Sequence, residues 1–303
     1  MLAGTYQGLG AINLAVDGDT IYAGTLSDGV WVLRALYATQ ASLPAPPAVP
    51  HDARYIAQTG YRIDDSTFWG YFNQRGGVRT FGYPTSRVFT FEGFPVQFFQ
   101  RRVMQRFPDG SVHLLNLLDV GLMPYITFNG SVVPAADPSL LAQAPRAGSA
   151  GYADAVVHFV QQQAPDTWNG LPVHFQQTFR HSVSLADAFP SGNANPALLP
   201  LLDLEVWGLP TSLPAYDPSN HQFVYQRFQR GIMHFDAACA CTQGILLADY
   251  LKAILTDSNL PAGLAGEAVN SPFFAQYCPG APHWLCRPED LPATNLTDAF
   301  TPE

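Results

Sequence analysis

Hydrophobic and polar residues alternate in three short segments at the start of the chain. These segments are Ile12–Val16, Thr20–Gly24 and Val30–Leu33, and turns that contain Asp-Gly separate them. Asp-Gly between apolar runs is typical of a β-hairpin. The pattern therefore predicts a short all-β segment over residues 1–40.

The alternation stops at a proline-rich stretch. Four of the ten residues from Ala41 to Pro50 are proline. Proline fixes φ and removes a backbone donor, so a stretch of this kind is extended and semi-rigid. We predict a linker over residues 41–53.

The rest of the chain contains an internal repeat. A Gly-x-Pro box occurs at Phe81–Ser86 and again at Trp207–Ser212, and both copies continue as Pro-Thr-Ser. A Phe-Gln-Arg box follows at Val96–Arg101 and at Tyr225–Arg230. The first box recurs after 126 residues and the second after 129, so the second copy contains a three-residue insertion. Two boxes that recur in the same order indicate a duplicated structural unit.

Each box predicts local structure. Proline disfavours a helix at the residue before it, so the Gly-x-Pro box is expected to end one element and open an extended strand. Residues Tyr225–Phe235 alternate with a period of two and predict one strand with both faces partly covered. The turn residues Pro108, Asp109 and Gly110 predict a β-hairpin in the first copy.

Several segments have helical periodicity and recognisable end signals. Ser66–Gln74 is rich in aromatic residues and stops at Gly76 and Gly77, which is typical of a helix C-terminus. The predicted helices are Ser66–Gln74, Tyr152–Gln163, Asn195–Leu204 with a break at Pro200, Thr242–Leu255 and Ala262–Tyr277.

Together these elements predict an α+β fold. It consists of two related β-hairpin/helix repeats with interspersed helices, preceded by the short all-β segment. We expect the first repeat over residues 54–135, a linker over 136–149, the second repeat over 150–258 and a disulfide-containing C-terminal tail over 259–303.

Composition narrows the class of protein. Of 303 residues 47% are hydrophobic and 13% charged, Lys252 is the only lysine, and the net charge is −9. Typical globular domains carry about 25% charged residues. The missing basic run argues against a nucleic-acid partner. No apolar run approaches the roughly 18 residues of a membrane-spanning helix.

The cysteines form two close pairs, Cys239 with Cys241 and Cys278 with Cys286. Cys239 and Cys241 could bind zinc with the nearby His234, but a single-residue spacer is not a usual zinc spacing. Disulfides are favoured. Four cysteines allow three connectivities, and the spacing leans toward local loop-closing pairs.

The compartment follows from several signals. Residues 1–9 lack the basic and apolar regions of a secretory signal, which alone favours the cytosol. The cysteine pairs, the lysine-poor composition and the glycosylation sequons at Asn129 and Asn295 point the other way. We expect an extracellular or cell-surface protein whose signal was removed or lies upstream.

No catalytic motif is found, and no metal or cofactor is expected. The chain lacks a Gly-x-Ser-x-Gly elbow, a His-Glu-x-x-His helix and a phosphate-binding loop. Asp203 and Glu205 could act as an acid/base pair on a glycoside. The first copy has Gly77 and Arg79 at these places, and residues two apart diverge on a helix. The sequence therefore leans away from an enzyme.

Residues that recur in the boxes are candidates for binding. An arginine fork can bind a carboxylate or an acidic sugar, or it can join a strand to a neighbouring loop. Aromatic side chains can stack on sugars, although most aromatic residues form core. The candidate binding residues are Trp69, Tyr71, Gln97, Arg101, Trp207, Tyr225, Gln226 and Arg230.

The second copy resembles the LGFP repeats of secreted bacterial envelope proteins. The resemblance lies in Gly208–Ser212, Phe228–Ile232 and Gly244. The first copy is similar, but Arg102 stands where the repeat has glycine, and the spacing exceeds that of a compact LGFP repeat. The region over residues 55–300 also looks like exported bacterial proteins with the same boxes. The resemblance implies a cell-envelope or extracellular setting and supplies no catalytic residues.

The all-β segment resembles one blade of a β-propeller over residues 14–34. A propeller needs several four-stranded blades, and one partial blade cannot bury both faces. Either the chain is the C-terminal part of a longer propeller protein, or these strands dock on the rest of the chain or on another copy.

The duplication, the cysteine pairs and the missing catalytic motif favour an extracellular, non-enzymatic binding or structural protein of the envelope. Unpaired strand edges could let it self-assemble into a filament or surface layer. The alternative is a carbohydrate- or peptidoglycan-binding or glycan-hydrolysing protein. The expected partners are copies of the chain or an envelope glycan.

Overall fold

The computed structural model describes residues 11–17, 20–25, 30–34, 52–279 and 291–303. The chain divides into two compact units, Met1–His51 and Asp52–Glu303. Most of the predicted linker over 41–53 lies outside the described residues.

The first unit contains a three-stranded antiparallel sheet in the order β1-β2-β3. Its strands are β1 (Ala11–Asp17), β2 (Thr20–Thr25) and β3 (Val30–Arg34). The hairpins predicted from the alternation are confirmed by the antiparallel pairing of β2 with both neighbours.

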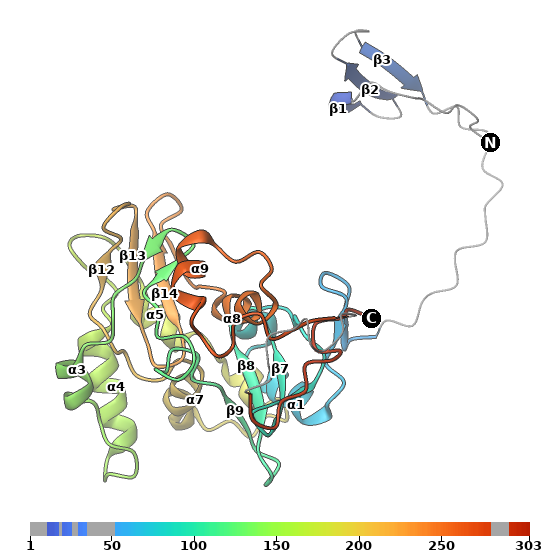
Figure 1. Cartoon of the computed structure of the whole chain (residues 1–303). Coiled ribbons are helices and arrows are strands. Elements are labelled where there is room, and N and C mark those ends of the chain that lie inside the picture. The colour runs from blue at the N-terminus through green and yellow to red at the C-terminus, as the bar shows by residue number, and fades with distance from the viewer. Residues whose placement is uncertain (1–10, 18–19, 26–29, 35–51, 280–290) are drawn as a thin grey trace. The chain divides into compact units, whose positions relative to one another are not determined.

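The second unit is an α+β fold, as predicted, and it is built around two four-stranded antiparallel meanders, each larger than the predicted hairpin (Figure 1). The first sheet comprises β6 (Phe89–Phe91), β7 (Phe94–Phe98), β8 (Val103–Arg106) and β9 (Val112–Leu114). The second comprises β12 (Ala215–Tyr216), β13 (Phe223–Arg227), β14 (Ile232–Asp236) and β15 (Cys241–Gly244). Both copies have the same register, because Gln97 pairs with Met104 and Gln226 with Met233.

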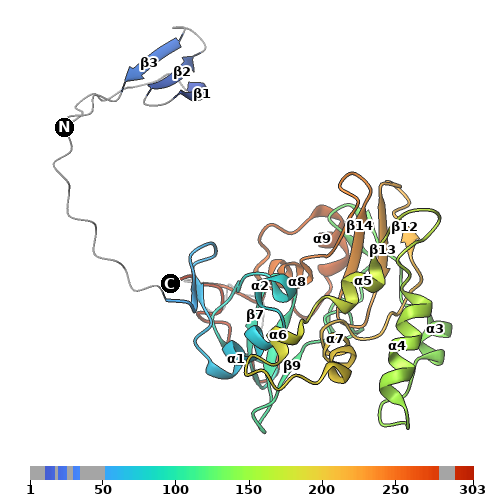
Figure 2. The same cartoon turned by 180° about the vertical axis from the view of Figure 1, so that it is seen from behind.

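Helices surround these sheets in both views of the molecule (Figure 2). They are α1 (Ser66–Gln74), α2 (Gly77–Phe81), α3 (Pro138–Gln143), α4 (Tyr152–Gln163), α5 (Phe175–Arg180), α6 (Leu185–Ala188), the 3-10 helix η1 (Pro196–Leu198), α7 (Leu199–Trp207), α8 (Leu247–Thr256) and α9 (Ala262–Ala268). Two short hairpins complete the unit: β4 (Tyr55–Ile56) with β5 (Tyr61–Arg62), and β10 (Thr127–Phe128) with β11 (Ser131–Val132).

Equivalent residues of the two copies build equivalent cores. One face of each sheet packs on its own helices. The matched core residues are Phe81, Phe99 and Met104 in the first copy and Trp207, Phe228 and Met233 in the second. Apolar burial is the main favourable term in folding, so this repeated core explains why the boxes recur.

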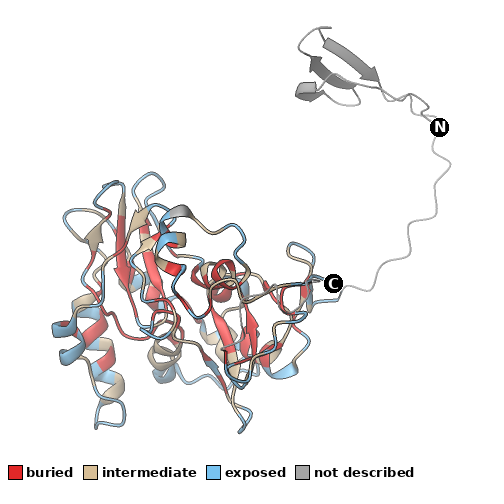
Figure 3. Cartoon of the chain, viewed as in Figure 1, coloured by how far each residue is buried: buried red, intermediate tan, exposed pale blue. Residues whose placement is uncertain are grey.

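The opposite faces of both sheets share a third core. Val96 and Val103 of the first copy belong to one buried cluster with Tyr225 and Ile232 of the second. Helices α8 and α9 contribute to this cluster and lie between the sheets in Figure 1. Figure 3 shows buried positions along the strands of both sheets and on α8. The two repeats therefore form one body.

Three predicted elements are corrected. The predicted strand Tyr225–Phe235 is two strands, β13 and β14, because the chain reverses where Phe228 N donates to Gly231 O (2.8 Å). The predicted helix Thr242–Leu255 begins only at Leu247, since Cys241–Gly244 pairs with β14. The predicted helix Ala262–Tyr277 ends at Ala268.

Other predicted helices are confirmed. Helices α1 and α4 have the predicted bounds. The break expected at Pro200 lies just before it, where η1 gives way to α7, and α7 continues past Leu204 to Trp207.

The segments outside the repeats are also structured. The predicted linker over 136–149 contains α3, and the side chain of Asp137 caps the N-terminus of this helix. The C-terminal tail returns to the first copy, where Asn295 forms an antiparallel bridge with Thr90. Among the described residues, no helix is long and apolar enough to cross a bilayer.

Candidate functional site

Each Gly-x-Pro box ends a helix and opens the following strand. Helix α2 ends at Phe81 and α7 at Trp207. The next residues, Gly82 and Gly208, have φ of +75° and +69°, a region that favours glycine. A Cβ at Gly82 would also lie 2.7 Å from the Cβ of Gln100. The box glycines are therefore structural.

The box glutamines are structural as well. Gln97 and Gln226 are fully buried. Each side-chain amide donates at 3.0 Å to the carbonyl of the last serine in its own Gly-x-Pro box. A second bond joins Gln97 to Arg62 O (2.5 Å) and Gln226 to Gln163 O (2.6 Å). These amides attach each sheet to an earlier element of its own repeat, β5 in the first copy and α4 in the second.

The two box arginines differ in what they bind. Arg230 Nη1 donates to the carbonyls of Leu204 (3.1 Å) and Glu205 (3.3 Å) near the C-terminus of α7. A cation there hydrogen-bonds to the last carbonyls of the helix and interacts favourably with the helix dipole. Arg101 instead reaches the other copy, where its Nε donates to Gly244 O (3.3 Å). Its terminal nitrogens hydrogen-bond to no other group in the described part of the chain.

Arg102 fills the space between the copies. It is 1% exposed, and its Nε donates to Val206 O (3.2 Å) while its Nη1 donates to Arg101 O (3.0 Å). Its guanidinium carbon lies 4.4 Å from the Trp207 ring centroid, a cation–π contact. Gly231, the matching residue of the second copy, has no room for a side chain, because a Cβ there would lie 2.7 Å from Arg102 Nη2.

Arg101 lies in the wall between two pockets. The histidine pocket, of about 680 Å³, is lined by Val78, Arg79, Thr80, Gly82, Tyr83, Gln100, Arg101, His174, Gln177, Thr178, His181, Ser182, Trp207, Thr242, Gln243 and Gly244. The aromatic pocket, of about 610 Å³, is lined by Gln100, Arg101, Phe128, Asn129, Ser131, Val133, Phe223, Tyr225, His234, Gln243, Gly244, Ile245, Leu246 and Tyr250. Gln100, Arg101, Gln243 and Gly244 line both, and we call the two pockets together the groove.

The groove is cationic. Neither set of lining residues contains a carboxylate, and both contain Arg101. Burial lowers the pKa of the Arg101 guanidinium, and Asp249 partly offsets this effect. Burial also raises the pKa of Asp249 to about 6, with Lys252 and Arg101 opposing it. Arg79 is already paired with Asp187 (2.5 Å). Arg101 is therefore the cation best placed to meet a ligand.

The structure brings three of the predicted binding residues to the groove. Arg101 lines both pockets, Trp207 the histidine pocket and Tyr225 the aromatic pocket. The other five lie outside it: Trp69 and Tyr71 belong to the first-copy core, Gln97 and Gln226 hold backbone carbonyls, and Arg230 caps α7.

Sequence reasoning missed several polar residues of the groove. His174 and His181 flank α5 and line the histidine pocket, whereas His234 lines the aromatic pocket. The spacing of seven between His174 and His181 is a signal that could have found them, because residues two helical turns apart share a face. Gln100 lies in the Phe-Gln-Arg box beside Arg101, yet it did not stand out.

The two acidic residues of α7 lie apart from the groove. Asp203 is 2% exposed and accepts a hydrogen bond from Val183 N (3.1 Å). Burial raises its pKa to about 8. Glu205 pairs with Arg75 (3.0 Å). Each carboxylate has its own protein partner, and neither lines the described pockets.

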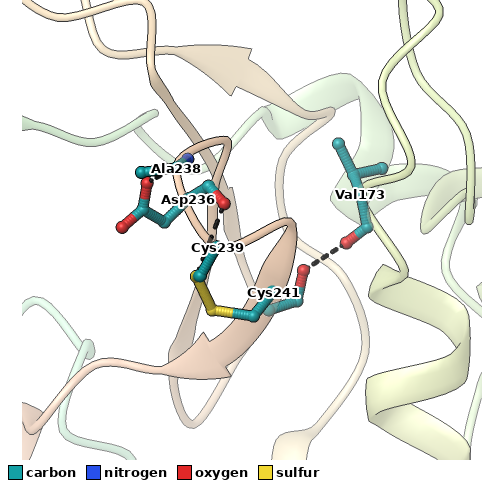
Figure 4. Close-up of a disulfide and its surroundings, with 6 residues drawn as sticks. Val173, Asp236, Ala238, Cys239 and Cys241 are labelled. Carbon is teal, nitrogen blue, oxygen red and sulfur yellow. Dashed lines mark hydrogen bonds between the residues drawn. A yellow bond between two sulfur atoms is a disulfide. The ribbon is translucent and has the colours of Figure 1, made fainter.

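Cys239 and Cys241 form a disulfide at the turn between β14 and β15 (Figure 4). Cys278 is also disulfide-bonded, and Cys286 lies outside the described residues. Over the described part of the chain, no group of three His, Cys, Asp or Glu side chains could hold a metal ion. At Cys239 and Cys241 the structure thus has the predicted disulfide in place of the zinc alternative.

The two glycosylation sequons are exposed, Asn129 on a turn and Asn295 at the bridge to Thr90. Asn129 has φ of +48° in the β10–β11 hairpin and lines the aromatic pocket. Asn295 Oδ1 accepts a bond from Thr297 Oγ1 (2.7 Å) within its sequon.

Comparisons of the chain with protein-family models, with curated proteins and with solved structures gave no match.

Proposed function

We propose that this protein is a non-enzymatic binding protein of the cell envelope or extracellular space. Its ligand is a carboxylate-bearing glycan that occupies the groove. The observation that carries the proposal is Arg101, whose terminal nitrogens stay available between two pockets while its repeat counterpart Arg230 caps a helix.

The chemistry of the groove fits an acidic sugar chain. Amides, hydroxyls and imidazoles supply hydrogen bonds for sugar hydroxyls in the histidine pocket. Aromatic side chains such as Tyr225 and Tyr250 supply apolar surface in the aromatic pocket. An arginine pairs with a carboxylate through two parallel hydrogen bonds, which fixes the orientation of the ligand as well as adding affinity. A chain of sugars can span both pockets with its acidic residue at Arg101.

A binding assay tests this proposal. The full chain is screened against acidic and neutral oligosaccharides, and affinities for the best ligand are compared with those of Arg101→Gln. We expect binding to acidic glycans and a loss of about 10- to 100-fold in the variant, since a hydrogen bond to a charged group is worth about 1.5–3 kcal/mol.

The matched control is Arg146→Gln, which removes an exposed arginine outside both pockets. It should bind like the unmodified protein, and melting temperatures check that both variants fold. Equal affinity of Arg101→Gln and the unmodified protein would refute the role of Arg101. Absence of binding to every acidic glycan would refute the proposed ligand.

Self-association is a second candidate, favoured by the first unit. Within the described residues, β1 and β3 pair only with β2, so each has an edge that another chain could extend. Light scattering of the full chain and of a chain lacking residues 1–51 tests it. An assembly that disappears on truncation would support self-association, and a monomer in both samples would exclude it.

A further inference from the structure

The disulfide between Cys239 and Cys241 encloses a single residue, Ala240. It lies where β14 ends at Asp236 and β15 begins at Cys241 (Figure 4). Both cysteines are exposed. A disulfide stabilises mainly by restricting the unfolded chain, and this effect is smallest when the closed loop is short. A loop of three residues gains little in this way.

The hairpin is also fixed without the disulfide. The β14–β15 ladder pairs Met233 with Gly244 and continues to Asp236 with Cys241. At the other side of β15, Thr242 Oγ1 donates to Val173 O (2.6 Å). The strand therefore keeps its backbone and side-chain partners when the two sulfurs separate, and the disulfide is redundant for the fold.

Two features of the turn bear on ring opening. Ala240 has φ of +50°, a left-handed conformation that is costly for a residue with a Cβ. Opening the ring frees this residue to relax. Cys239 Sγ lies 3.6 Å from Asp236 O, so a thiol formed there has an acceptor ready. The turn thus holds a costly backbone conformation while the ring is closed, and a Cys239 thiol would have a backbone carbonyl within reach.

We propose that Cys239 and Cys241 form a thiol–disulfide exchange site that oxidises accessible thiols. A thiolate attacks one cysteine sulfur, a mixed disulfide forms, and the Cys239–Cys241 bond breaks as the other cysteine leaves as a thiolate. A second thiolate then attacks the mixed disulfide and releases the oxidised substrate disulfide. Two thiols lose two electrons and their protons, and both cysteines become thiols. Exposed disulfides are the labile and reactive ones, in contrast to buried structural disulfides.

The test measures the two disulfide sites within one native chain. The full protein is equilibrated in glutathione buffers of graded ratio, free thiols are alkylated, and peptides containing Cys239–Cys241 and Cys278 are quantified by mass spectrometry. We expect Cys239–Cys241 to open at a [GSH]²/[GSSG] value at least tenfold lower than Cys278, with an unchanged circular dichroism spectrum. A parallel arm with a reduced protein dithiol, thioredoxin, distinguishes small-molecule thiols from protein thiols as substrates.

The control variant is Cys239→Ser/Cys241→Ser, which should fold, retain the Cys278 disulfide and oxidise neither thiol. If Cys239–Cys241 opens no earlier than the Cys278 disulfide, or opens only when the chain unfolds, the exchange site is excluded. Equal thiol oxidation by the double serine variant would also overturn the proposal.

Discussion

Single residues decide how the two copies of the repeat differ. Arg101 and Arg230 occupy the same place in the same box, yet only Arg230 caps its own helix. Next to them, Arg102 and Gly231 are also matched, and the large side chain of one copy occupies the space that the other leaves empty. The copies therefore pack through complementary residues at equivalent positions.

This complementarity predicts the effect of Gly231→Ala. The new Cβ would lie within 3 Å of Arg102 Nη1 and Nη2, and Arg102 is enclosed by its bonds to Val206 and Arg101 and by Trp207. Overpacking of this kind costs about 1–3 kcal/mol of unfolding free energy. In an Arg102→Ala background the clash is absent, so Gly231→Ala should lower the unfolding free energy by no more than about 0.5 kcal/mol.

Urea denaturation of the four proteins in this cycle measures the coupling between the two sites. The cost of Arg102→Ala itself cancels from the comparison. An equal effect of Gly231→Ala in both backgrounds would show that Arg102 does not restrict this position.

Asp203 predicts a pH dependence of stability. Burial raises its pKa to about 8, above the value of 3.8 expected in an unfolded chain. Between these values the folded state binds more protons than the unfolded state, so this group makes stability fall as pH rises. Asp203→Asn keeps an acceptor for Val183 N and removes the titration. The variant should therefore gain stability relative to the unmodified protein as pH increases from 4 to 8.

Thermal unfolding of both proteins at several pH values checks this expectation. All other titrating groups are shared, so they cancel from the difference between the two curves. A difference that stays constant over the range would mean that Asp203 is ionised in the folded protein throughout.

At the scale of elements, local signals were sufficient where an element depends on its own residues. Helix α1 was predicted with correct bounds because the glycines after it mark its end, and Gly76 with φ of +93° separates it from α2. The β13–β14 turn was missed because the period of two continues through it, and its only signal is Gly231. The local pattern of β15 predicted the start of a helix. Its pairing with β14 overrides that pattern, so the segment is a strand.

The glutamine attachments predict a matched pair of variants. Gln226→Met keeps the side-chain volume but removes the amide that donates hydrogen bonds to Ser212 O and Gln163 O. Lost hydrogen bonds to buried carbonyls should lower the unfolding free energy by about 1–3 kcal/mol. Because the contacts repeat, Gln97→Met should cost a similar amount.

Gln161→Met is the control for these variants, since Gln161 is an exposed residue of α4. It should change stability by less than about 0.5 kcal/mol. Equal unfolding free energies for all three variants, measured in urea, would show that the buried amides do not hold the sheets to their neighbours.

At the scale of the whole molecule, the groove was beyond sequence reasoning. The walls of the histidine pocket come from both boxes of the first copy, from α5 with its flanking histidines and from β15. These segments are far apart in the chain. Only the packing of the two copies brings them together. The boxes pointed to Arg101, Trp207 and Tyr225, but recurrence alone could not separate Arg101 from Arg230.

The C-terminal segment also acts across the whole fold, which gives a final prediction. Phe300 is 8% exposed, and its ring centroid lies 5.6 Å from those of both Phe89 and Phe98 in the first-copy sheet. Phe300→Ala should lower the unfolding free energy by about 3 kcal/mol, because it leaves a cavity in the core that both copies share. Leu213→Ala, at a side chain 54% exposed, is the control and should be near neutral. Phe300 lies three positions from Glu303, the last residue of the sequence. A small effect of Phe300→Ala in urea denaturation would mean that the C-terminal segment contributes little to the stability of this core. A large effect would make the tail an integral part of the first repeat.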